Sequence, residues 1–397
     1  MPWKETYPLQ ERKRFIEDWL RAGAATNVAA LCRLYGISRR TGYKWLERFR
    51  QGGWVELEDR SHAAHRQPRR IAESVERRLI EARRQHPSWG PKKLRAWLES
   101  KEPQTSWPAA STIGEALKRA GLVRVRQRMR RLAEAAPSPL REPKAPNDVW
   151  TIDYKGQFRT GDGVLCYPLT VVDGYSRFLL NCTAHVGTSY EEARRGLERL
   201  FLQRGLPRRI RSDNGSPFAS IGTGRLSRLN VWWLKLGIAV ERIEPGKPQQ
   251  NGRHERLHRT LKAETVRPPA GDRRRQQHRF DLFRQEYNQE RPHEALGQRP
   301  PAAFYAPATR AYPSELADLD YPGHWERRRV RHDGRIKFLG EKYFLSEALT
   351  RELVGLVEVD EAIWQIWFGP VELALFDAAN RVLWPLGSAV SGPRGGH

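Results

Sequence analysis

Residues 150–255 constrain the fold more than any other stretch, because three acidic residues there fall on three different predicted elements. Asp153 stands in a run of alternating apolar and polar residues, which predicts a strand. Asp213 follows residues 206–210, a pattern typical of a buried strand, and an open α/β sheet places its site at the carboxyl ends of such strands. Glu255 lies where a polar loop gives way to helical spacing.

Three converging carboxylates suit Mg²⁺, a hard cation that takes oxygen ligands and keeps room for water and phosphate oxygens. Two such ions about 3.5–4 Å apart activate the attacking oxygen and stabilise the leaving one in an in-line phosphoryl displacement. The chain has 46 Asp and Glu residues, so each acid is equally explained as a surface charge or a turn residue. For Asp213 taken alone, followed by Asn and Gly, the turn is the better explanation.

The order of the motifs is more informative than any single acid. Five segments resemble, in order, the catalytic core of the retroviral-integrase-like transposases of bacterial insertion sequences: WTID at 150–153, VVDGYSR at 171–177, SDNG at 212–215, NGRHERLHRTLK at 251–262 and YNQERPHEAL at 287–296. The resemblance implies a ribonuclease-H-like fold on which Asp153, Asp213 and Glu255 are the catalytic, metal-binding triad. The 41 residues between Asp213 and Glu255 are a few more than is common in that family, and we expect the extra length in residues 222–225.

The surrounding segments predict a mixed α/β core over residues 147–306. Residues 164–173 and 177–186 predict two strands that are joined at Gly174 and form an antiparallel sheet with the first strand. Two further strands and four helices are predicted at residues 206–210, 238–243, 188–205, 226–236, 251–266 and 272–287. A mixed five-stranded sheet with flanking helices is what a ribonuclease-H-like core requires.

Charge points to a polyanionic partner. The chain has 70 Lys and Arg residues against 46 acids, a net charge of +24, and residues 1–150 contain 32 of the basic and 17 of the acidic residues. A surplus of this size favours a nucleic acid over an ordinary solvated basic surface.

Residues 1–59 predict a helix-turn-helix domain of three helices. A turn at residues 36–38 leads into the last helix, and Ser38 is placed to cap it. The second helix of such a motif enters the major groove by its amino-terminal end. We therefore expect the first turns of the last helix to bind DNA through Arg39, Arg40, Thr41 and Lys44. The alternative is a purely structural three-helix bundle.

Residues 69–123 predict a second helix-turn-helix domain, similar to the second one of the same transposase group. Its last helix is expected to be capped by Ser111 and closed by Gly121, and Lys92 and Lys93 are the candidate DNA contacts. Its tryptophans are better explained as core residues than as base contacts. Two tandem readers would span one terminal inverted repeat.

The remaining segments flank the core. Residues 124–146 predict a basic and Pro-rich linker. Its Arg126, Arg128 and Arg130 either lie along DNA phosphates or belong to a solvated hinge. Residues 325–388 alternate repeatedly between apolar and polar residues in five short runs, which predicts a small all-β barrel. Residues 389–397 form a Gly-rich tail that we expect to be flexible.

The helix that carries Glu255 offers further candidates. Asn251, Arg259 and Lys262 share its face at helical spacing, and the resemblance implies that they hold DNA beside the metal ions. His254 and His258 also suggest metal ligands or general bases, but Mg²⁺ prefers oxygen, so His258 is expected to orient neighbouring groups or to meet DNA. The acidic residue at 173, at a turn, is expected to be structural.

The cysteines and the hydropathy indicate the compartment. Cys32, Cys166 and Cys182 have no paired spacing, which speaks against a disulfide framework and a structural zinc site. The amino terminus has no apolar signal region, and no apolar run approaches the roughly 20 residues that span a bilayer. We expect a soluble bacterial protein of the cytoplasm, associated with the nucleoid and with no membrane partner.

The hypothesis that covers most of the sequence is a DNA transposase. It binds the terminal inverted repeats of an insertion sequence, nicks them to free 3′ hydroxyls and joins them to target DNA by two-metal-ion phosphoryl transfer, with Mg²⁺ as cofactor and Mn²⁺ as a substitute. Each site must act on a paired end, so a homodimer or larger assembly on double-stranded DNA is expected. A non-catalytic, site-specific DNA-binding regulator derived from a transposase, and a metal-dependent nuclease on the same fold, stay open as alternatives.

Overall fold

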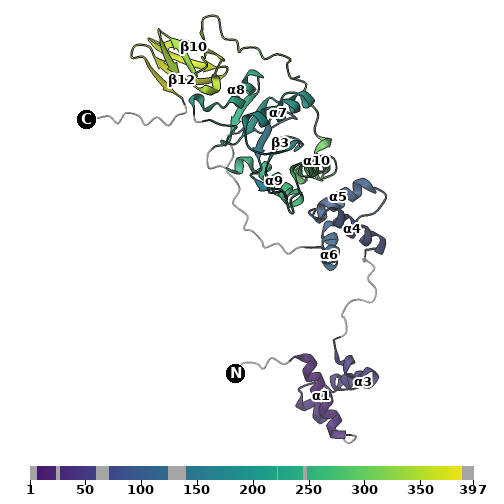
Figure 1. The fold of residues 1–397 in the computed structure, drawn as a ribbon. Helices are drawn as coiled ribbons and strands as arrows, with labels where there is room; N and C mark the ends of the chain where they lie inside the picture. Colours follow the sequence, from purple (N-terminus) through teal and green to yellow (C-terminus); the bar gives the residue numbers. More distant parts are fainter. Residues whose placement is uncertain are drawn as a thin grey trace, which may run out of the picture. The chain divides into compact units, whose positions relative to one another are not determined.

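A computed structural model describes residues 7–23, 27–59, 71–123, 140–220, 222–244 and 248–386 (Figure 1). The chain divides into two compact units, Met1–Arg70 and Ile71–His397. The candidate DNA contacts Arg126, Arg128 and Arg130, and the tail at 389–397, lie outside the described residues. Within the described ranges, no helix is both long enough and apolar enough to cross a membrane.

The first unit is the predicted three-helix arrangement: α1 Pro8–Ala22, α2 Val28–Leu34 and α3 Arg39–Gly52, followed by the short 3-10 helix η2 Gly53–Leu57. Ser38 caps α3 as predicted, because its hydroxyl accepts the backbone N–H of Thr41 at 3.1 Å. The helices enclose one small core of Phe15, Ile16, Cys32, Trp45, Leu46 and Leu57. The short turn between α2 and α3 is that of a helix-turn-helix.

The second unit begins with three more helices: α4 Glu73–Gln85, α5 Pro91–Lys101 and α6 Ala110–Arg119. Trp89, Trp97 and Trp107 are buried in their common core, as predicted. The predicted cap at Ser111 is wrong. The helix starts two residues earlier than such a cap requires, so Ala109 takes the cap position without a side-chain hydrogen bond and Ser111 lies inside the first turn. Gly121 ends the helix with a φ of 70°, which favours glycine.

A mixed sheet follows, built from β1 Trp150–Tyr154, β2 Phe158–Arg159, β3 Leu165–Asp173, β4 Leu179–His185, β5 Arg209–Ser212 and β6 Ala239–Arg242. Five strands lie in the order β4-β3-β1-β5-β6, and β2 adds a two-residue pairing with β3. The pairs β1/β3 and β3/β4 are antiparallel, whereas β1/β5 and β5/β6 are parallel. The predicted mixed five-stranded sheet is confirmed, with β2 as an additional short strand.

Helices cover both faces of this sheet (Figure 1). One face packs against α7 Tyr190–Arg204 and α8 Arg228–Lys235 through a fully apolar core that includes Trp150 and Ile152 of β1. The other face packs against α9 Gly252–Thr265 and α10 Arg273–Gln289. Because successive residues of a strand point to opposite faces, Thr151 and Asp153 lie on the side of α9.

Side chains of α10 close the outer edge of β4, which has only one strand as a neighbour. Asn288 accepts the N–H of Leu179 at 2.8 Å and donates to its carbonyl at 2.9 Å. Gln277 accepts the N–H of Ala184 at 2.8 Å and donates to the carbonyl of Cys182 at 3.0 Å. An edge strand with satisfied backbone groups does not pair with other chains.

The carboxy-terminal part is all-β, as predicted, with seven strands in place of five: β7 Glu326–Arg329, β8 Arg335–Phe338, β9 Glu341–Phe344, β10 Leu353–Asp360, β11 Ile363–Phe368, β12 Val371–Asp377 and β13 Val382–Pro385. They form a five-stranded antiparallel sheet, β13-β12-β11-β10-β7, and a separate β8-β9 hairpin, so the predicted single barrel is two sheets around one core. The two missed strands are sheet edges, where the apolar alternation that reveals a strand is weak.

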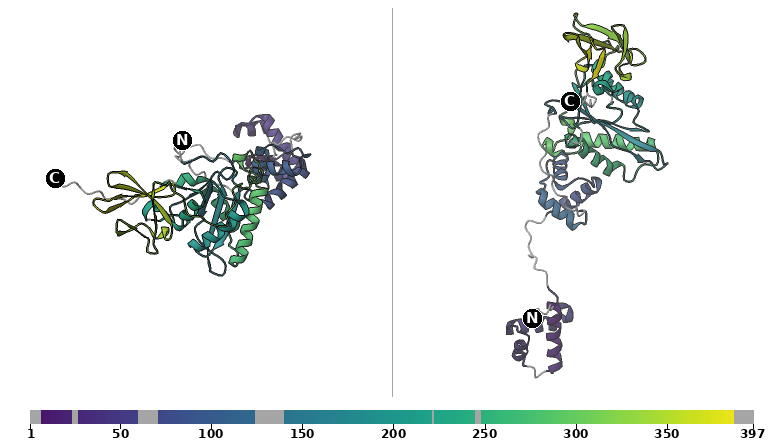
Figure 2. Two further views of the ribbon diagram at one scale, coloured as in Figure 1. Left: turned by 90° about the horizontal axis from the view of Figure 1, so that it is seen from above. Right: turned by 90° about the vertical axis from the view of Figure 1, so that its left-hand side faces the viewer.

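This β part shares its core with α8 instead of standing apart (Figure 2). Leu226, Val231 and Leu234 pack in one cluster with residues of the β sheets. The predicted extra loop between Asp213 and Glu255 is the 3-10 helix η3 Thr223–Arg225, and the N–H of Gly224 donates to the carbonyl of Leu386 at 3.2 Å. The additional residues therefore support the carboxy-terminal sheets.

Candidate active site

The three predicted acids lie on neighbouring elements. Asp153 is on β1, opposite Thr170 of β3 in the antiparallel register. Asp213 directly follows β5, the parallel neighbour of β1, and its Oδ1 accepts the N–H of Gly215 at 3.2 Å, as in the predicted turn. Glu255 is an exposed residue in the first turn of α9.

Asp153 has the most unusual electrostatics of the three. Its pKa is raised from the ordinary 3.8 to about 7, first by burial, then by the neighbouring charge of Asp213 and, more weakly, by that of Glu255. Burial also raises the pKa of Asp213. A carboxylate that is costly to charge, with two further acids close enough to act on it, is relieved by a bound cation.

The three carboxylates are nevertheless not drawn into one tight ligand cluster. Among the residues that the structure describes, the group whose ligand atoms all lie within 4.8 Å of one another is Asp153, His254 and His258. Asp213 and Glu255 act on the charge of Asp153 from farther away. The charges of Asp213 and Glu255 thus affect Asp153 although the three carboxylates are not in contact. A cation held by all three would have to draw Asp213 and Glu255 closer to Asp153.

Both histidines are buried on the inner side of α9, at 1% and 6% exposure. Burial lowers the pKa of His254 to about 3 and that of His258 to about 2, so both rings are neutral near pH 7. Each ring bonds the hydroxyl of Thr170, at 2.6 and 2.7 Å. Of the two roles expected for His258, the buried position fits the orienting one and excludes direct contact with DNA.

Asn251 has a different place from the predicted one. It ends the 3-10 helix η4 Pro248–Asn251 just before α9 and is 8% exposed. Its amide donates to Asp153 Oδ2 at 3.3 Å, so it supports the acid and is not a surface contact to DNA. Helical spacing from Glu255 gave the correct side of the helix, but the helix begins one residue later.

Three cations lie near the acids, and two of them are the predicted Arg259 and Lys262. Arg259 and Lys262 are exposed on α9, as a phosphate contact requires. Lys155 was missed. Its positive charge lowers the pKa of Asp153, and its own pKa is lowered by burial and then by Lys262. The available signal was its position two residues after Asp153, on the same face of an alternating strand.

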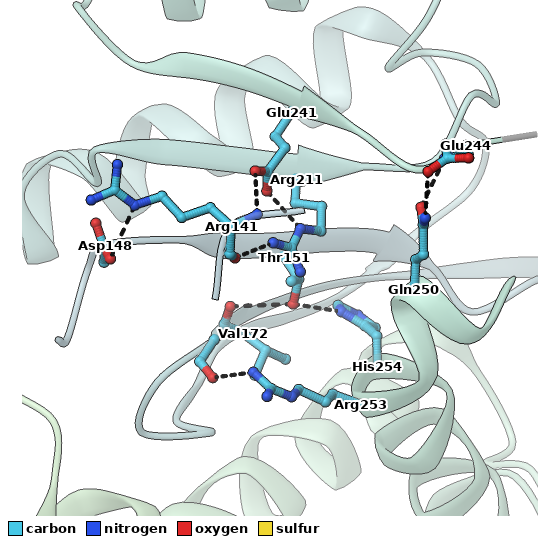
Figure 3. Close-up of polar contacts among 11 residues, drawn as sticks. Arg141, Asp148, Thr151, Val172, Arg211, Glu241, Glu244, Gln250, Arg253 and His254 are labelled. Carbon is cyan, nitrogen blue, oxygen red and sulfur yellow. Dashed lines mark hydrogen bonds and ion pairs between the residues drawn. The ribbon is translucent and has the colours of Figure 1, made fainter. Parts of the chain in front are cut away.

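A layer of polar contacts underlies the triad, and each acid has a member of it two residues earlier in the chain (Figure 3). The hydroxyl of Thr151 lies between the carbonyl of Val172 and the ring of His254, at 3.4 and 2.9 Å. Arg211 donates to Glu241 at 2.7 Å and to the carbonyl of residue 141 at 2.6 Å. Arg253 donates to the carbonyl of residue 174 at 3.3 Å.

Asp173 is structural, as predicted. It is fully buried at the end of β3, and its carboxylate accepts the N–H groups of Asn147 at 2.7 Å and of Ser176 at 2.8 Å. It also accepts the hydroxyl of Ser176 at 2.5 Å. These donors come from the turn after β3 and from the segment that precedes β1, so the carboxylate ties the two segments together.

The predicted contacts of the first helix-turn-helix are mostly exposed. Arg39, Arg40 and Lys44 face solvent on α3, whereas Thr41 bonds the capping Ser38 and is half-buried. Sequence reasoning missed Tyr43, which is 57% exposed between these basic residues. Its position four residues after Arg39 and three after Arg40 was the available signal.

The contacts predicted for the second helix-turn-helix are partly engaged inside the unit. Lys92 pairs with Glu294 of the 3-10 helix η5 Glu294–Leu296, at 3.2 Å. Lys93 is half-buried, and burial and then the charge of Arg291 lower its pKa to about 8. Lys93 is therefore less available to DNA than the exposed Lys44 of α3, whereas the side chain of Lys92 stays 71% exposed.

Two family models described as "Integrase core domain" match residues 143–248 and 236–301. One described as "Helix-turn-helix domain" matches residues 11–69, and one described as "Homeodomain-like domain" matches residues 41–117. Together the two integrase models cover the sheet and helices that carry all three acids.

Two relatives come from bacterial insertion elements. The 31.7 kDa protein of insertion element IS407 from Burkholderia multivorans is 29% identical over 255 residues, which are 61% of this chain and 85% of that protein. The 39.2 kDa protein of insertion element IS476 from Xanthomonas euvesicatoria is 28% identical over 251 residues, 60% of this chain and 66% of that protein. A chain in the simian T-cell lymphotropic virus intasome bound to PP2A regulatory subunit B56 gamma is 17% identical, with a TM-score of 0.35, over 70% of this chain and 98% of that chain.

The fold, the acids and the family models define an integrase-core protein, with the core of a polynucleotidyl transferase. The helix-turn-helix domains and the insertion-element relatives narrow the class further. Together these findings support an integrase-like transposase of the insertion-sequence type.

Proposed function

We propose that this protein cuts and joins DNA at the ends of its element. It binds the terminal inverted repeats, nicks each end to free a 3′ hydroxyl and transfers that hydroxyl to target DNA. The observation that carries the proposal is the raised pKa of Asp153, caused by burial and by Asp213 and Glu255, within an integrase core. A buried carboxylate whose ionisation is opposed by two neighbouring acids is stabilised by a bound cation.

We propose Asp153, Asp213 and Glu255 as the residues that hold the cations, with Mg²⁺ as the natural ion and Mn²⁺ as a substitute. The donor set of the triad is all oxygen, which fits a hard divalent cation. Bound divalent ions supply an activated attacking oxygen and charge stabilisation at the leaving oxygen.

The chain's own groups complete the site. Asn251 orients one oxygen of Asp153. Lys155, Arg259 and Lys262 place positive charge beside the acids, where the DNA backbone must lie if a phosphate is to reach them.

The two helix-turn-helix domains, over residues 1–59 and 69–123, are proposed as the readers of one inverted repeat. Arg39, Arg40 and Lys44 meet the major groove, and exposed Tyr43 lies among them. The core over residues 147–306 and the β part over residues 325–388 act on the cut end and the target. Because two ends must be handled together, the active form is a dimer or a larger assembly on DNA in the bacterial cytoplasm, at the nucleoid.

The test is cleavage and strand transfer by the full chain on duplexes that carry the element's own ends, with Mg²⁺ or Mn²⁺. Metal-dependent 3′ nicks and joined products, lost in Asp213→Asn, would support the proposal. Specific binding of the ends without any metal-dependent product would favour the non-catalytic regulator instead. Metal-dependent cleavage of DNA that lacks the ends would favour a nuclease.

A further inference from the structure

A chain of buried polar groups leads from β1 through α9 and β3 back to Asp153. Thr151 Oγ1 lies 2.9 Å from His254 Nδ1, and His254 Nε2 lies 2.6 Å from Thr170 Oγ1. Thr170 Oγ1 lies 2.7 Å from His258 Nε2, and His258 Nδ1 faces Asp153 Oδ2 at 3.7 Å. Figure 3 shows the first link, where Thr151 and His254 face one another. The chain therefore starts and ends on β1, two residues apart.

The protons of this chain can be counted. A threonine hydroxyl has one proton, and a neutral imidazole has one N–H and one acceptor nitrogen. Thr170 cannot donate to both rings, so at least one histidine must donate to Thr170. If His258 Nδ1 carries the lone pair, that lone pair faces Asp153 and repels its carboxylate whenever the acid is ionised, as it is when it binds a cation.

One assignment avoids that repulsion, and it directs both threonine protons to the rings instead of to the carbonyls of Val172 and Asp153, which lie 3.4 Å from Thr151 Oγ1 and 3.1 Å from Thr170 Oγ1. Thr151 donates to His254 Nδ1, His254 Nε2 donates to Thr170, Thr170 donates to His258 Nε2, and His258 Nδ1–H points at Asp153. All four groups then donate in the same direction, toward the acid. Hydrogen bonds aligned in this way strengthen one another in a buried environment.

The same count separates the histidines from a metal site. Both nitrogens of His254 are engaged, one by Thr151 and one by Thr170. A cation bound to His254 would have to break one of these bonds. Thr170 and His254 are 0% and 1% exposed, so no water is placed to replace the lost partner. His254 therefore has no free nitrogen for a cation, and the nitrogen of His258 that remains, Nδ1, faces Asp153 Oδ2.

We propose that Thr151, His254, Thr170 and His258 form a positioning chain that holds the Asp153 carboxylate in the orientation that binds the cation. Asn251 donates to the same oxygen, at 3.3 Å. This inference rests on the proposed function, because it assumes that Asp153 is a cation ligand. Partners behind a metal-binding group change cation affinity about 10–100-fold when they are removed, without touching the ion themselves.

The test uses Mn²⁺ alone, bound to the full chain without DNA and followed by electron paramagnetic resonance, with thermal unfolding of the metal-free protein beside it. Thr170→Val keeps the shape of the side chain and removes the hydroxyl at the centre of the chain. We expect it to weaken Mn²⁺ binding about 10-fold, with Thr170→Ser within about twofold of the wild type. Thr260→Val is the matched control, because that hydroxyl bonds only the carbonyl of Arg256 in its own helix.

His258→Gln is the second variant, and it decides the matter if Thr170→Val does not fold. The glutamine amide still reaches toward Thr170 but leaves nothing in place of Nδ1 beside Asp153, so we again expect about 10-fold weaker binding. Thr151→Val, at the far end of the chain, should give a smaller loss in the same direction.

Three results would contradict the proposed positioning chain. Weaker binding in His258→Gln with Thr170→Val unchanged would make His258 a ligand in its own right. Lower unfolding temperatures with unchanged Mn²⁺ affinity would make the chain purely structural. No Mn²⁺ binding by the wild type would remove its purpose. If the variants weaken Mn²⁺ binding as expected but the wild type shows no strand transfer, the proposed function is wrong and the positioning chain is still supported.

Discussion

The two faces of the central sheet are formed by the same strands but have different roles. On the α7/α8 side, β1 contributes Trp150 and Ile152 to an apolar core. On the α9/α10 side the same strand contributes Thr151 and Asp153, which lie beside the buried His254 and His258. Both faces contain an apolar cluster that stabilises the fold, and the α9/α10 face also holds an acid that resists ionisation, at a cost in stability.

This comparison predicts that changes on the two faces separate activity from stability. The largest effect is expected for Asp213→Asn, because the amide keeps the shape of the side chain and removes a cation ligand. We expect strand transfer to fall by about 1,000-fold or more, with the free energy of unfolding unchanged or slightly increased. Gel assays of joined products and denaturant unfolding measure the two quantities. Activity within about tenfold of the wild type would contradict the catalytic role of the α9/α10 face.

Phe201→Ala tests the apolar face. The ring is fully buried in the α7/α8 core, and removing it leaves a cavity, so we expect a loss of about 3–5 kcal/mol in the free energy of unfolding. Mn²⁺ affinity of the remaining folded protein should stay within about twofold of the wild type. A variant of normal stability and weak Mn²⁺ binding would show that the faces are not independent.

Asp153→Asn measures the cost of the polar face. In the metal-free wild type, Asp153 is protonated when folded and ionised when unfolded between its ordinary pKa of 3.8 and about 7. Stability therefore falls as the pH rises through this window, and the whole cost is present above about pH 7. The cost has an upper limit of about 4 kcal/mol, since one pKa unit corresponds to about 1.36 kcal/mol.

The asparagine variant lacks this titration. Its free energy of unfolding relative to the wild type should increase from about pH 5 to about pH 8 without metal, and denaturant unfolding at several pH values measures the difference. Saturating Mn²⁺ should stabilise the wild type more than the variant. A difference that does not change with pH would mean that Asp153 titrates normally.

Lys262→Ala should give the smallest effect, because it removes one exposed charge from the rim of the polar face. DNA binding should weaken by about 1 kcal/mol, and the slope of log affinity against log salt concentration should become shallower by about one. Fluorescence anisotropy at several salt concentrations measures both. An unchanged slope would place the DNA backbone away from Lys262.

The sequence predicted much of this arrangement, for reasons that are local. Alternation along β1 predicted the strand and put Asp153 on one face of it, and Ser38 with the basic turn after it predicted the start of α3. The wrong prediction at Ser111 also has a local cause, because Ala109 and Ser111 are two residues apart and either can precede the first turn of this helix.

What the sequence could not show depends on contacts between distant elements. His254 and Thr170 are 84 residues apart and meet only when α9 lies on β3. The place of Asn251 on Asp153 has the same origin. Likewise, the loop at residues 222–225 could be predicted as extra length, but its role in supporting the carboxy-terminal sheets needed the shared core with α8.

Mn²⁺ binding by the full-length wild type, Asp153→Asn, Asp213→Asn and Glu255→Gln, compared by electron paramagnetic resonance, tests the central claim most directly. If the three acids make one cation site, each substitution should weaken binding by at least about tenfold. If Asp213→Asn and Glu255→Gln bind Mn²⁺ like the wild type while Asp153→Asn does not, the triad is not one site. The cation would then belong to Asp153 and its neighbouring histidines, which would contradict both the proposed triad and the positioning chain.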